Sequence, residues 1–288
     1  METLKVNDFN LLQTLECGQC FNFERISASE NDSIDTCCYE YNIIACRKHL
    51  HIRQEGNELV FLNASSDDVE NIWKHYFDLD RNYDIIKEHI LKADPSLKDV
   101  INRYYGIKIL NQEFPETLIS FIISQNKSIP QIKQLVRRIS ENYGTLISGT
   151  EDEPRYAFPD LKQLDAISEQ DFRDMKTGFR APYLRNAVDM LVNSELTAEE
   201  LRKMSFHDAK AKLMQIKGVG DKVANCVLLF GLGFRNAFPV DVWIKRIMEE
   251  LYFHKDTDKK VIEQYGNNLF GDYGGYAQQY LFIYAKNK

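Results

Sequence analysis

The stretch LMQIKGVGDKVANCVLLF, residues 213–230, decides how this 288-residue chain folds. Apolar residues on either side of Gly218-Val219-Gly220 have helical spacing, whereas the two glycines between them predict a tight turn. We expect one helix to end at Gly218 and a second to begin at Asp221, whose carboxylate is a candidate N-cap. The stretch therefore predicts a helix-hairpin-helix.

The turn of this hairpin predicts a site for DNA phosphates. Its glycines allow a phosphate close to the main chain, and the N–H groups that open the second helix point toward that phosphate. Gly218, Val219 and Gly220 are therefore predicted to grip a DNA backbone without reading its sequence. For the Gly-x-Gly pattern alone, an ordinary turn between two helices is the alternative. A monovalent cation in the hairpin stays an open question, and no other cofactor is expected.

A carboxylate, Asp241, follows 19 residues after Lys222 in the segment Phe238-Pro239-Val240-Asp241. The proline fixes the angle at which the chain enters another expected helix, so Asp241 lies at its first turn. An aspartate at that position is often only a helix cap. A lysine at one helix start and an aspartate at the next indicate instead a nucleophile and its electrostatic partner.

Composition limits the class of protein and of partner. Only 14 Gly and 7 Pro exclude collagen and low-complexity sequence, and 44% hydrophobic residues supply a sizeable core. The net charge of -7 argues against a nucleic-acid partner, because phosphate affinity comes largely from Lys and Arg. However, residues 1–80 carry 15 acidic and 6 basic residues, whereas the other 208 carry 28 and 30. Residues 127–138 and 202–222 are locally basic, and we expect them to form a DNA-binding face.

The cysteines and the N-terminus bear on metal binding and location. Five of the six cysteines lie in the first 46 residues, where Cys17 and Cys20 form a C-x-x-C pair. Adjacent Cys37 and Cys38 are a poor second pair, so we expect free thiols and no metal site. The chain shows neither a secretory signal nor a membrane-spanning apolar run. We expect a soluble, intracellular monomer, in a bacterial or archaeal cytoplasm or a eukaryotic nucleus.

Along the chain, the pattern predicts an α+β protein that is mostly α. Residues 5–65 contain short strand-like stretches separated by polar turns, which predict a small antiparallel sheet. From residue 66 onward the apolar spacing is helical, and the polar stretch 144–156 divides the helices into two lobes. We place an N-terminal β-domain with flanking helices at residues 1–100 and the helical region at 101–288, with residues 66–100 able to join either. Helices are expected over residues 83–93, 97–105, 114–125, 129–143, 161–167, 181–193, 206–216, 222–232, 240–251, 258–269 and 276–286.

The hairpin pattern Gly218-Val219-Gly220-x-Lys222-x-Ala224 and the later Pro239-Val240-Asp241 resemble the helix-hairpin-helix, Gly/Pro-rich, Asp superfamily of DNA glycosylases. The 8-oxoguanine DNA glycosylase branch is the most similar. Four further segments match that branch in the same order and extend the resemblance over nearly the whole chain: CGQCF (17–21), FIISQN (121–126), GFRA (178–181) and YAQQYLF (276–282). The resemblance implies a TATA-binding-protein-like β-domain on two helical lobes, a lesion pocket between the lobes, and double-stranded DNA containing 8-oxoguanine as the partner.

The resemblance also implies the chemistry of a bifunctional glycosylase and abasic-site lyase. An enzyme that removes a base from a duplex must flip the nucleotide out and stabilise positive charge at the sugar C1′. Lys222 would attack C1′ and form a Schiff base, and burial near a helix N-terminus favours its neutral amine. Asp241 would stabilise the charged sugar and the amine.

Four positions match the lesion pocket of the resembled branch. Gly18 would accept the N7 proton of 8-oxoguanine through its carbonyl, Cys226 and Phe282 would sandwich the flipped base, and Gln278 would bind its Watson–Crick edge. Without the resemblance, Gly18 could be a strand bend, and Cys226 and Phe282 could be ordinary core residues.

A second group of residues is expected to contact the base opposite the lesion. Arg180 and Asn126 match positions that hold cytosine in the animal-type enzymes, whereas Gln131 stands where those enzymes carry another arginine. Phe179 is predicted to wedge into the base stack, with a buried loop aromatic as the alternative. Two more positions depart from the family pattern: Lys127 replaces a second asparagine, and Trp243 replaces a histidine near a phosphate of the lesion strand.

Two other functions stay open. A related glycosylase could act on another oxidised base, but many thymine-glycol and adenine glycosylases carry a C-terminal iron–sulfur cluster of four cysteines, and only Cys226 lies beyond residue 46. A non-catalytic DNA-binding protein could use the hairpin as a phosphate clamp, and it would need neither Lys222 nor Asp241.

Overall fold

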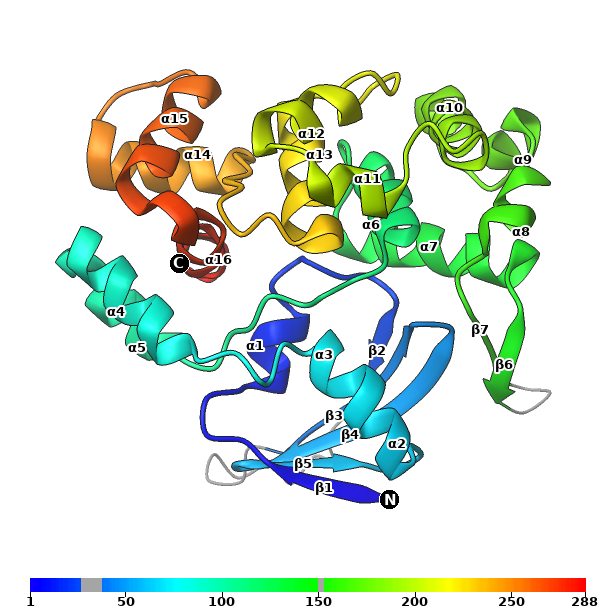
Figure 1. Cartoon of the computed structure of the whole chain (residues 1–288), viewed down its shortest axis with the longest axis horizontal. Helices are drawn as coiled ribbons and strands as arrows, with labels where there is room; N and C mark the ends of the chain where they lie inside the picture. Colours follow the sequence, from blue (N-terminus) through cyan, green and yellow to red (C-terminus); the bar gives the residue numbers. More distant parts are fainter. Residues whose placement is uncertain (27–37, 150–152) are drawn as a thin grey trace.

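The computed structural model of the chain describes residues 1–26, 38–149 and 153–288. Figure 1 shows a sheet next to the N-terminus at one end of the molecule and helices filling the rest. The mostly helical α+β class expected from the sequence is confirmed. Cys37, considered above as half of a cysteine pair, lies outside the described residues.

Five strands of the described chain form the N-terminal sheet, in the spatial order β1-β5-β4-β3-β2 with every neighbouring pair antiparallel. One face of the sheet buries its side chains against a short helix α1 and the helical segment 66–76, which lie over it in Figure 1. Tyr41, Ile43 and Ile52 alternate with more exposed neighbours, as a half-buried sheet requires. The elements are β1 (Glu2–Lys5), α1 (Leu11–Leu15), β2 (Phe23–Arg25), β3 (Cys38–Ala45), β4 (Lys48–Glu55), β5 (Glu58–Phe61), α2 (Ser66–Asp68), the π-helical turn Val69–Trp73 and α3 (Lys74–Tyr76).

A second hydrophobic core joins the helices of the remaining chain. Its centre is the contact between α6 (Phe114–Ile123), which is buried from Thr117 to its end, and α13 (Asp221–Val227). Residues 83–104 pack into this core, whereas residues 69–77 pack on the sheet. The other helices are α4 (Tyr83–Ala93), α5 (Lys98–Arg103), α7 (Ile129–Tyr143), α8 (Leu161–Asp165), α9 (Glu169–Asp174), α10 (Ala181–Val192), α11 (Ala198–Lys203), α12 (Phe206–Leu213), α14 (Val242–Met248), α15 (Lys259–Phe270) and α16 (Gly274–Lys286). Leu228–Leu232 and Glu249–Phe253 extend α13 and α14 as π-helical turns, and Pro95–Leu97, Gly178–Arg180 and Gly271–Tyr273 are short 3-10 turns.

Three short helices were not expected from the sequence pattern: α1, α9 and α11. Each spans only five or six residues, too few to show an apolar period. Each instead begins at a polar residue whose side chain accepts a main-chain N–H bond: Asn10, Ser168 and Thr197. Local capping, together with burial of one or a few apolar residues, stabilises them.

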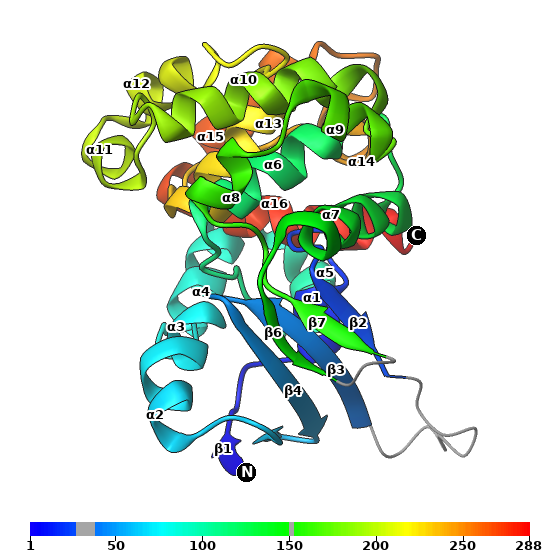
Figure 2. The same ribbon diagram turned by 90° about the vertical axis from the view of Figure 1, so that its right-hand side faces the viewer.

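The stretch 144–156, expected to be only a divider between lobes, contains the strands β6 (Leu146–Gly149) and β7 (Pro154–Tyr156). Ser148 Oγ lies 2.8 Å from His49 Nδ1 of β4, and Arg155 donates to Glu24 of β2 at 2.9 Å. These contacts dock the pair of strands beside the N-terminal sheet, as Figure 2 shows. Alternation over three or four residues is too short a signal to reveal such strands in the sequence.

The helix-hairpin-helix is present, but the expected end of its first helix and the expected N-cap of its second are wrong. Its first helix, α12, ends at Leu213 rather than at Gly218, because residues 214–218 form turns. Asp221 begins α13 but does not cap it, since Gly220 occupies the N-cap position. The Asp221 carboxylate instead forms an ion pair with Lys210 of α12 at 3.0 Å, which ties the two helices of the hairpin together.

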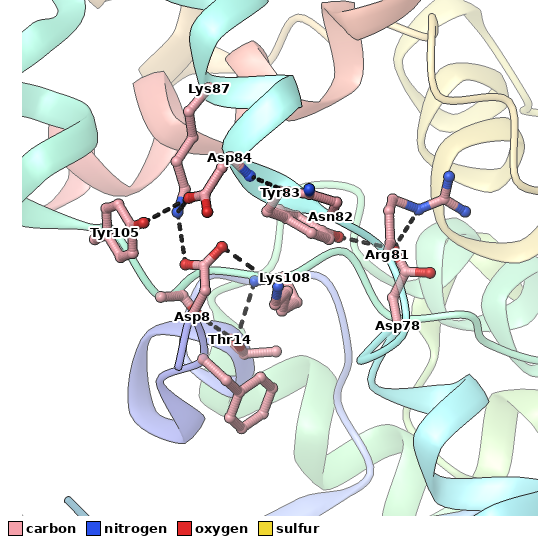
Figure 3. Close-up of polar contacts among 12 residues, drawn as sticks. Asp8, Thr14, Asp78, Arg81, Asn82, Tyr83, Asp84, Lys87, Tyr105 and Lys108 are labelled. Atoms are coloured by element: carbon pink, nitrogen blue, oxygen red, sulfur yellow. Dashed lines mark hydrogen bonds and ion pairs between the residues drawn. The ribbon is translucent and has the colours of Figure 1, made fainter. Parts of the chain in front are cut away.

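A buried ion-pair cluster around Asp8 joins the N-terminal segment to the helical core (Figure 3). Lys87 Nζ lies 2.6 Å from Asp8 Oδ1, and Lys108 Nζ lies 3.5 Å from Asp8 Oδ2. The two lysines also lie over the rings of Tyr105 and Tyr83, at 3.0 and 3.8 Å from the ring centroids. Burial lowers the pKa of both lysines, and the Asp8 carboxylate opposes that effect. One carboxylate therefore compensates two buried cations.

Asp8→Ala should lower the free energy of unfolding by about 3 kcal/mol, because it leaves buried Lys108 without an ion pair and buried Lys87 with only its longer pair to Asp84. Asp84→Ala is the matched control, since Asp84 is exposed and lies 3.7 Å from Lys87. It should cost no more than about 1 kcal/mol. Urea denaturation of both variants measures the difference, and equal losses would show that the Asp8 cluster adds no more than a surface pair.

Candidate active site

Lys222 lies in the first turn of α13, directly after the hairpin. Its Nζ donates a hydrogen bond to Ser124 Oγ at 3.1 Å, and Ser124 follows the last residue of α6. The same ammonium lies 5.1 Å from the ring centroid of Phe121. Ser124 and Phe121 belong to a segment matched in the sequence but were not singled out as site residues. The amine is thus held by a neutral hydroxyl where the start of α13 meets the end of α6.

Cys226 lies one turn after Lys222 on the same helix and is buried. Burial raises the pKa of its thiol to about 11, Lys222 opposes that rise, and the Asp241 carboxylate adds to it. The thiol therefore stays protonated at neutral pH. Lys222 and Asp241 thus act on the Cys226 thiol with opposite sign.

Asp241 is the N-cap of α14 and has a second carboxylate oxygen to spare. Its Oδ1 accepts the N–H groups of Trp243 at 2.9 Å and Ile244 at 2.8 Å. Its Oδ2 accepts no hydrogen bond from any residue that the structure describes. The two interpretations considered from the sequence, a helix cap and an electrostatic partner, are therefore compatible, since each can use a different oxygen.

The hairpin turn presents its two glycines to solvent and buries Val219 between them. Gly218 has φ +77°, and a Cβ on it would lie 2.3 Å from the Tyr183 ring of α10, so only glycine fits there. Lys217 N donates to Asn186 Oδ1 at 2.8 Å, which adds a second link to α10. Three residues were predicted to contact phosphates. Gly218 and Gly220 expose their main chain to solvent, whereas the side chain of Val219 is buried and anchors the turn in the core.

The residues expected to bind the lesion come together from opposite ends of the chain. Gly18 has φ +75°, and a Cβ on it would lie 3.3 Å from the Phe282 ring of α16 and 3.5 Å from Ile129 of α7. Gln278 lies one turn before Phe282 and is buried, with its Oε1 accepting a bond from Gln279 at 2.9 Å. The Phe282 ring thus packs against Gly18, where a larger residue would crowd it.

The residues expected near the opposite base behave differently from one another. Phe179 is 50% exposed, which argues against a buried loop aromatic, and the Arg180 guanidinium stacks 4.3 Å from its ring centroid. Arg180 itself is only 3% exposed and donates to the carbonyls of Thr177 and Gln125. The arginine therefore supports the exposed ring and does not itself reach into solvent.

Asn126 and Gln131 flank the start of α7 and are both exposed. Asn126 has φ +51°, a left-handed conformation that asparagine tolerates better than most residues. Gln131 Oε1 accepts the Ser128 N–H at 3.1 Å, as the third residue of a capping box does. The capping bond uses one lone pair of the Gln131 carbonyl and leaves its NH₂ group free to donate to a ligand.

Other classes of site find no support in the described parts of the chain. These residues include no group of three or more His, Cys, Asp or Glu side chains that could hold a metal ion. Likewise, no helix among residues 1–26, 38–149 and 153–288 is long and apolar enough to cross a membrane. Two surface hollows of about 370 and 300 Å³ are lined by none of the residues expected at the site.

Comparison with known families matches two models in succession. Residues 3–118 match the N-terminal domain of 8-oxoguanine DNA glycosylase, and residues 119–271 match the HhH-GPD superfamily of base excision DNA repair proteins. The boundary between them falls inside α6.

Individual proteins agree with these matches. An N-glycosylase/DNA lyase of Arabidopsis thaliana is 33% identical over 204 residues, covering 67% of this chain and 55% of the plant protein. An N-glycosylase/DNA lyase of Saccharomyces cerevisiae is 32% identical over 59% of this chain and 53% of its own length. The chain thus spans about half the length of these curated relatives. The 8-oxoguanine glycosylase/lyase of Clostridium acetobutylicum, solved with double-stranded DNA containing cytosine opposite 8-oxoguanine, is 36% identical with a TM-score of 0.89, covering 100% of this chain and 98% of that one.

Gly218→Ala should destabilise the protein by at least about 1 kcal/mol, because alanine disfavours the positive φ and its methyl group meets Tyr183. Gly220→Ala is the matched control, since a Cβ there meets no atom within 4 Å and the residue has φ -106°. Its free energy of unfolding should fall by only about 0.5 kcal/mol, the cost of alanine in place of glycine at an N-cap. Urea denaturation of both variants measures the contrast. A well-tolerated Gly218→Ala would mean that the turn does not depend on this glycine.

Proposed function

The chain belongs to the HhH-GPD superfamily of base excision DNA repair proteins, and we propose that it removes 8-oxoguanine from double-stranded DNA and then cuts the strand at the abasic site. The observation that carries the proposal is the placement of Lys222. Its amine follows the hairpin directly, is held by a neutral hydroxyl, and lies one turn before Cys226 on α13. The relatives named as N-glycosylase/DNA lyases support the same activity.

In the proposed reaction, the neutral Lys222 amine forms a bond to the sugar C1′. The glycosidic bond breaks, and its electron pair leaves with the base, which takes up a proton. Opening of the sugar then gives a Schiff base between C1′ and Nζ. Loss of a proton from C2′ expels the 3′-phosphate and cuts the strand. These steps use only side chains, water and DNA, so we propose that the enzyme needs no cofactor and works in the presence of a chelator.

In the proposed reaction, Asp241 stabilises the positive charge that develops on the sugar. The sugar becomes positively charged as the glycosidic bond breaks, and a preorganised carboxylate stabilises that charge at little reorganisation cost. The cap bonds to Oδ1 fix the orientation of the carboxylate and leave Oδ2 for the sugar or the amine. A single aspartate can therefore begin α14 and serve the chemistry.

Lys222→Gln should abolish both release of 8-oxoguanine and borohydride trapping on a damaged duplex, while lesion binding is largely kept. The change removes the amine but keeps the stem of the side chain and the hairpin. Gel analysis of products and of the covalent adduct measures both steps. Adduct formed by the variant would place the nucleophile elsewhere, and no adduct with the parent protein would favour a non-catalytic clamp. A duplex with thymine glycol is tested in parallel. Release of thymine glycol instead of 8-oxoguanine would indicate a glycosylase for another oxidised base.

Asp241→Asn should lower the single-turnover rate of base release by at least about 100-fold, with Kd for the duplex kept within a few-fold. Asparagine can still accept the two cap bonds through its amide oxygen, so the variant isolates the charge from the cap. Thermal unfolding should confirm that the cap survives. A rate within a few-fold of the parent would reduce Asp241 to a helix cap.

We propose further that discrimination of the base opposite the lesion is relaxed. Arg180 uses its guanidinium on two main-chain carbonyls, and Gln131 offers a neutral NH₂ where an arginine would offer fixed, charged donors. Phe179, exposed and backed by Arg180, would fill the gap in the base stack beside the flipped nucleotide. Contacts that only cytosine satisfies are therefore few.

The protein should excise 8-oxoguanine opposite all four bases, with only a mild preference for cytosine. Each unpaired buried donor costs roughly 1 to 3 kcal/mol, so Gln131→Arg should sharpen the preference by about one to two orders of magnitude. Gln131→Ala is the control, because it removes the same capping-box bond without adding donors. The preference is measured as single-turnover rates of excision on four duplexes that differ only in the base opposite 8-oxoguanine. A strict preference for cytosine in the parent protein would contradict this interpretation.

A further inference from the structure

Part of the positive charge in the basic runs expected to bind DNA is neutralised within the protein. Three of the ten basic side chains in residues 127–138 and 202–222 pair with carboxylates, and two others donate to main-chain carbonyls. The ion pairs are Arg137–Glu141, Lys203–Glu199, Lys210–Asp221 and Lys210–Glu263, and the bonds to carbonyls are Arg138 to Met175 and Arg202 to Gly231. An unpaired cation elsewhere on the surface would then add to the affinity for phosphates.

The exposed side of α14, next to Asp241, carries such a cation. Arg246 is exposed, and its guanidinium lies 5.3 Å from the ring centroid of Trp243, one turn earlier on the helix. Val242, which adjoins Asp241, is 66% exposed despite being apolar. Asp241, Val242, Trp243 and Arg246 thus lie together within the first two turns of α14.

No carboxylate of the described residues pairs with Arg246, whereas two carboxylates pair with the neighbouring Lys245. Lys245 pairs with Glu249 and, at 2.7 Å, with Asp256, whereas Arg246 has no ion pair with any of the described residues. Stacking on an indole limits the rotamers of a guanidinium without neutralising it. An ordered, unpaired guanidinium is well suited to a phosphate, which it can bind through two parallel hydrogen bonds.

We propose that Arg246, held on Trp243, binds a backbone phosphate of the DNA strand that passes Asp241, while Val242 packs against the adjoining sugar. This inference rests on the proposed function, because it takes the DNA to lie across Lys222 and Asp241. The contact anchors the strand on the α14 side of the site, as the hairpin glycines do on the α13 side. It is independent of base sequence, since a phosphate contact positions DNA without reading it.

The test measures Kd for a duplex with a tetrahydrofuran abasic analogue, which the enzyme cannot cleave, at several salt concentrations. Arg246→Gln should weaken binding by about 3- to 10-fold and lower the slope of log Kd against log salt by about 0.9. Arg246→Lys keeps the charge and should restore the slope. Trp243→Ala keeps the charge but loses its platform, so it should weaken binding with the slope unchanged.

Lys5→Gln is the matched control for charge. Lys5 is exposed at the end of β1, at the opposite end of the molecule from α14 in Figure 1. This variant should bind as the parent does. Arg246→Gln with a Kd within twofold of the parent and an unchanged slope would overturn the proposal. Borohydride trapping of the parent on an 8-oxoguanine duplex keeps the two questions apart: an adduct together with unchanged Arg246→Gln binding rejects only the phosphate contact, whereas no adduct rejects the proposed activity itself.

Discussion

The packing of α13 against α6 is the constraint on which the rest of the site depends. Because α6 is buried and α13 is buried after its first turn, Lys222 is the point where the helix pair meets solvent. The bond from Lys222 to Ser124 then joins the start of one helix to the end of the other. Any shift between the two helices would move the amine, the hairpin turn and Cys226 as a unit relative to Ser124.

The structure also explains how an acidic chain can present a surface suited to DNA. Exposed main chain at Gly218 and Gly220 offers N–H groups that need no positive side chain. Part of the local positive charge is used inside the protein, as in the pairing of Lys210 with Asp221 across the hairpin. Net charge is thus a poor guide to this interface, because placement of a few groups matters more than their sum.

Much of the fold and of the family could be predicted from the sequence. The family resemblance is confirmed, and so is the mostly helical α+β class. The helix predicted over residues 129–143 is found as Ile129–Tyr143, because fifteen residues are long enough for an apolar period to show and Pro130 marks the start. Short elements such as α1 and β6 escaped prediction, since caps and distant contacts stabilise them.

The sequence by itself determined the hairpin, its two glycines, and the order of lysine and aspartate along the chain. Those features follow from local conformational limits, such as the positive φ of Gly218, which neighbouring residues reveal. Only the tertiary structure decided that Arg180 is buried beneath Phe179 and that Asp221 pairs with Lys210 instead of capping its helix. It also decided that Gly18 meets Phe282. These outcomes depend on which groups distant segments bring within bonding distance, and no local pattern specifies that.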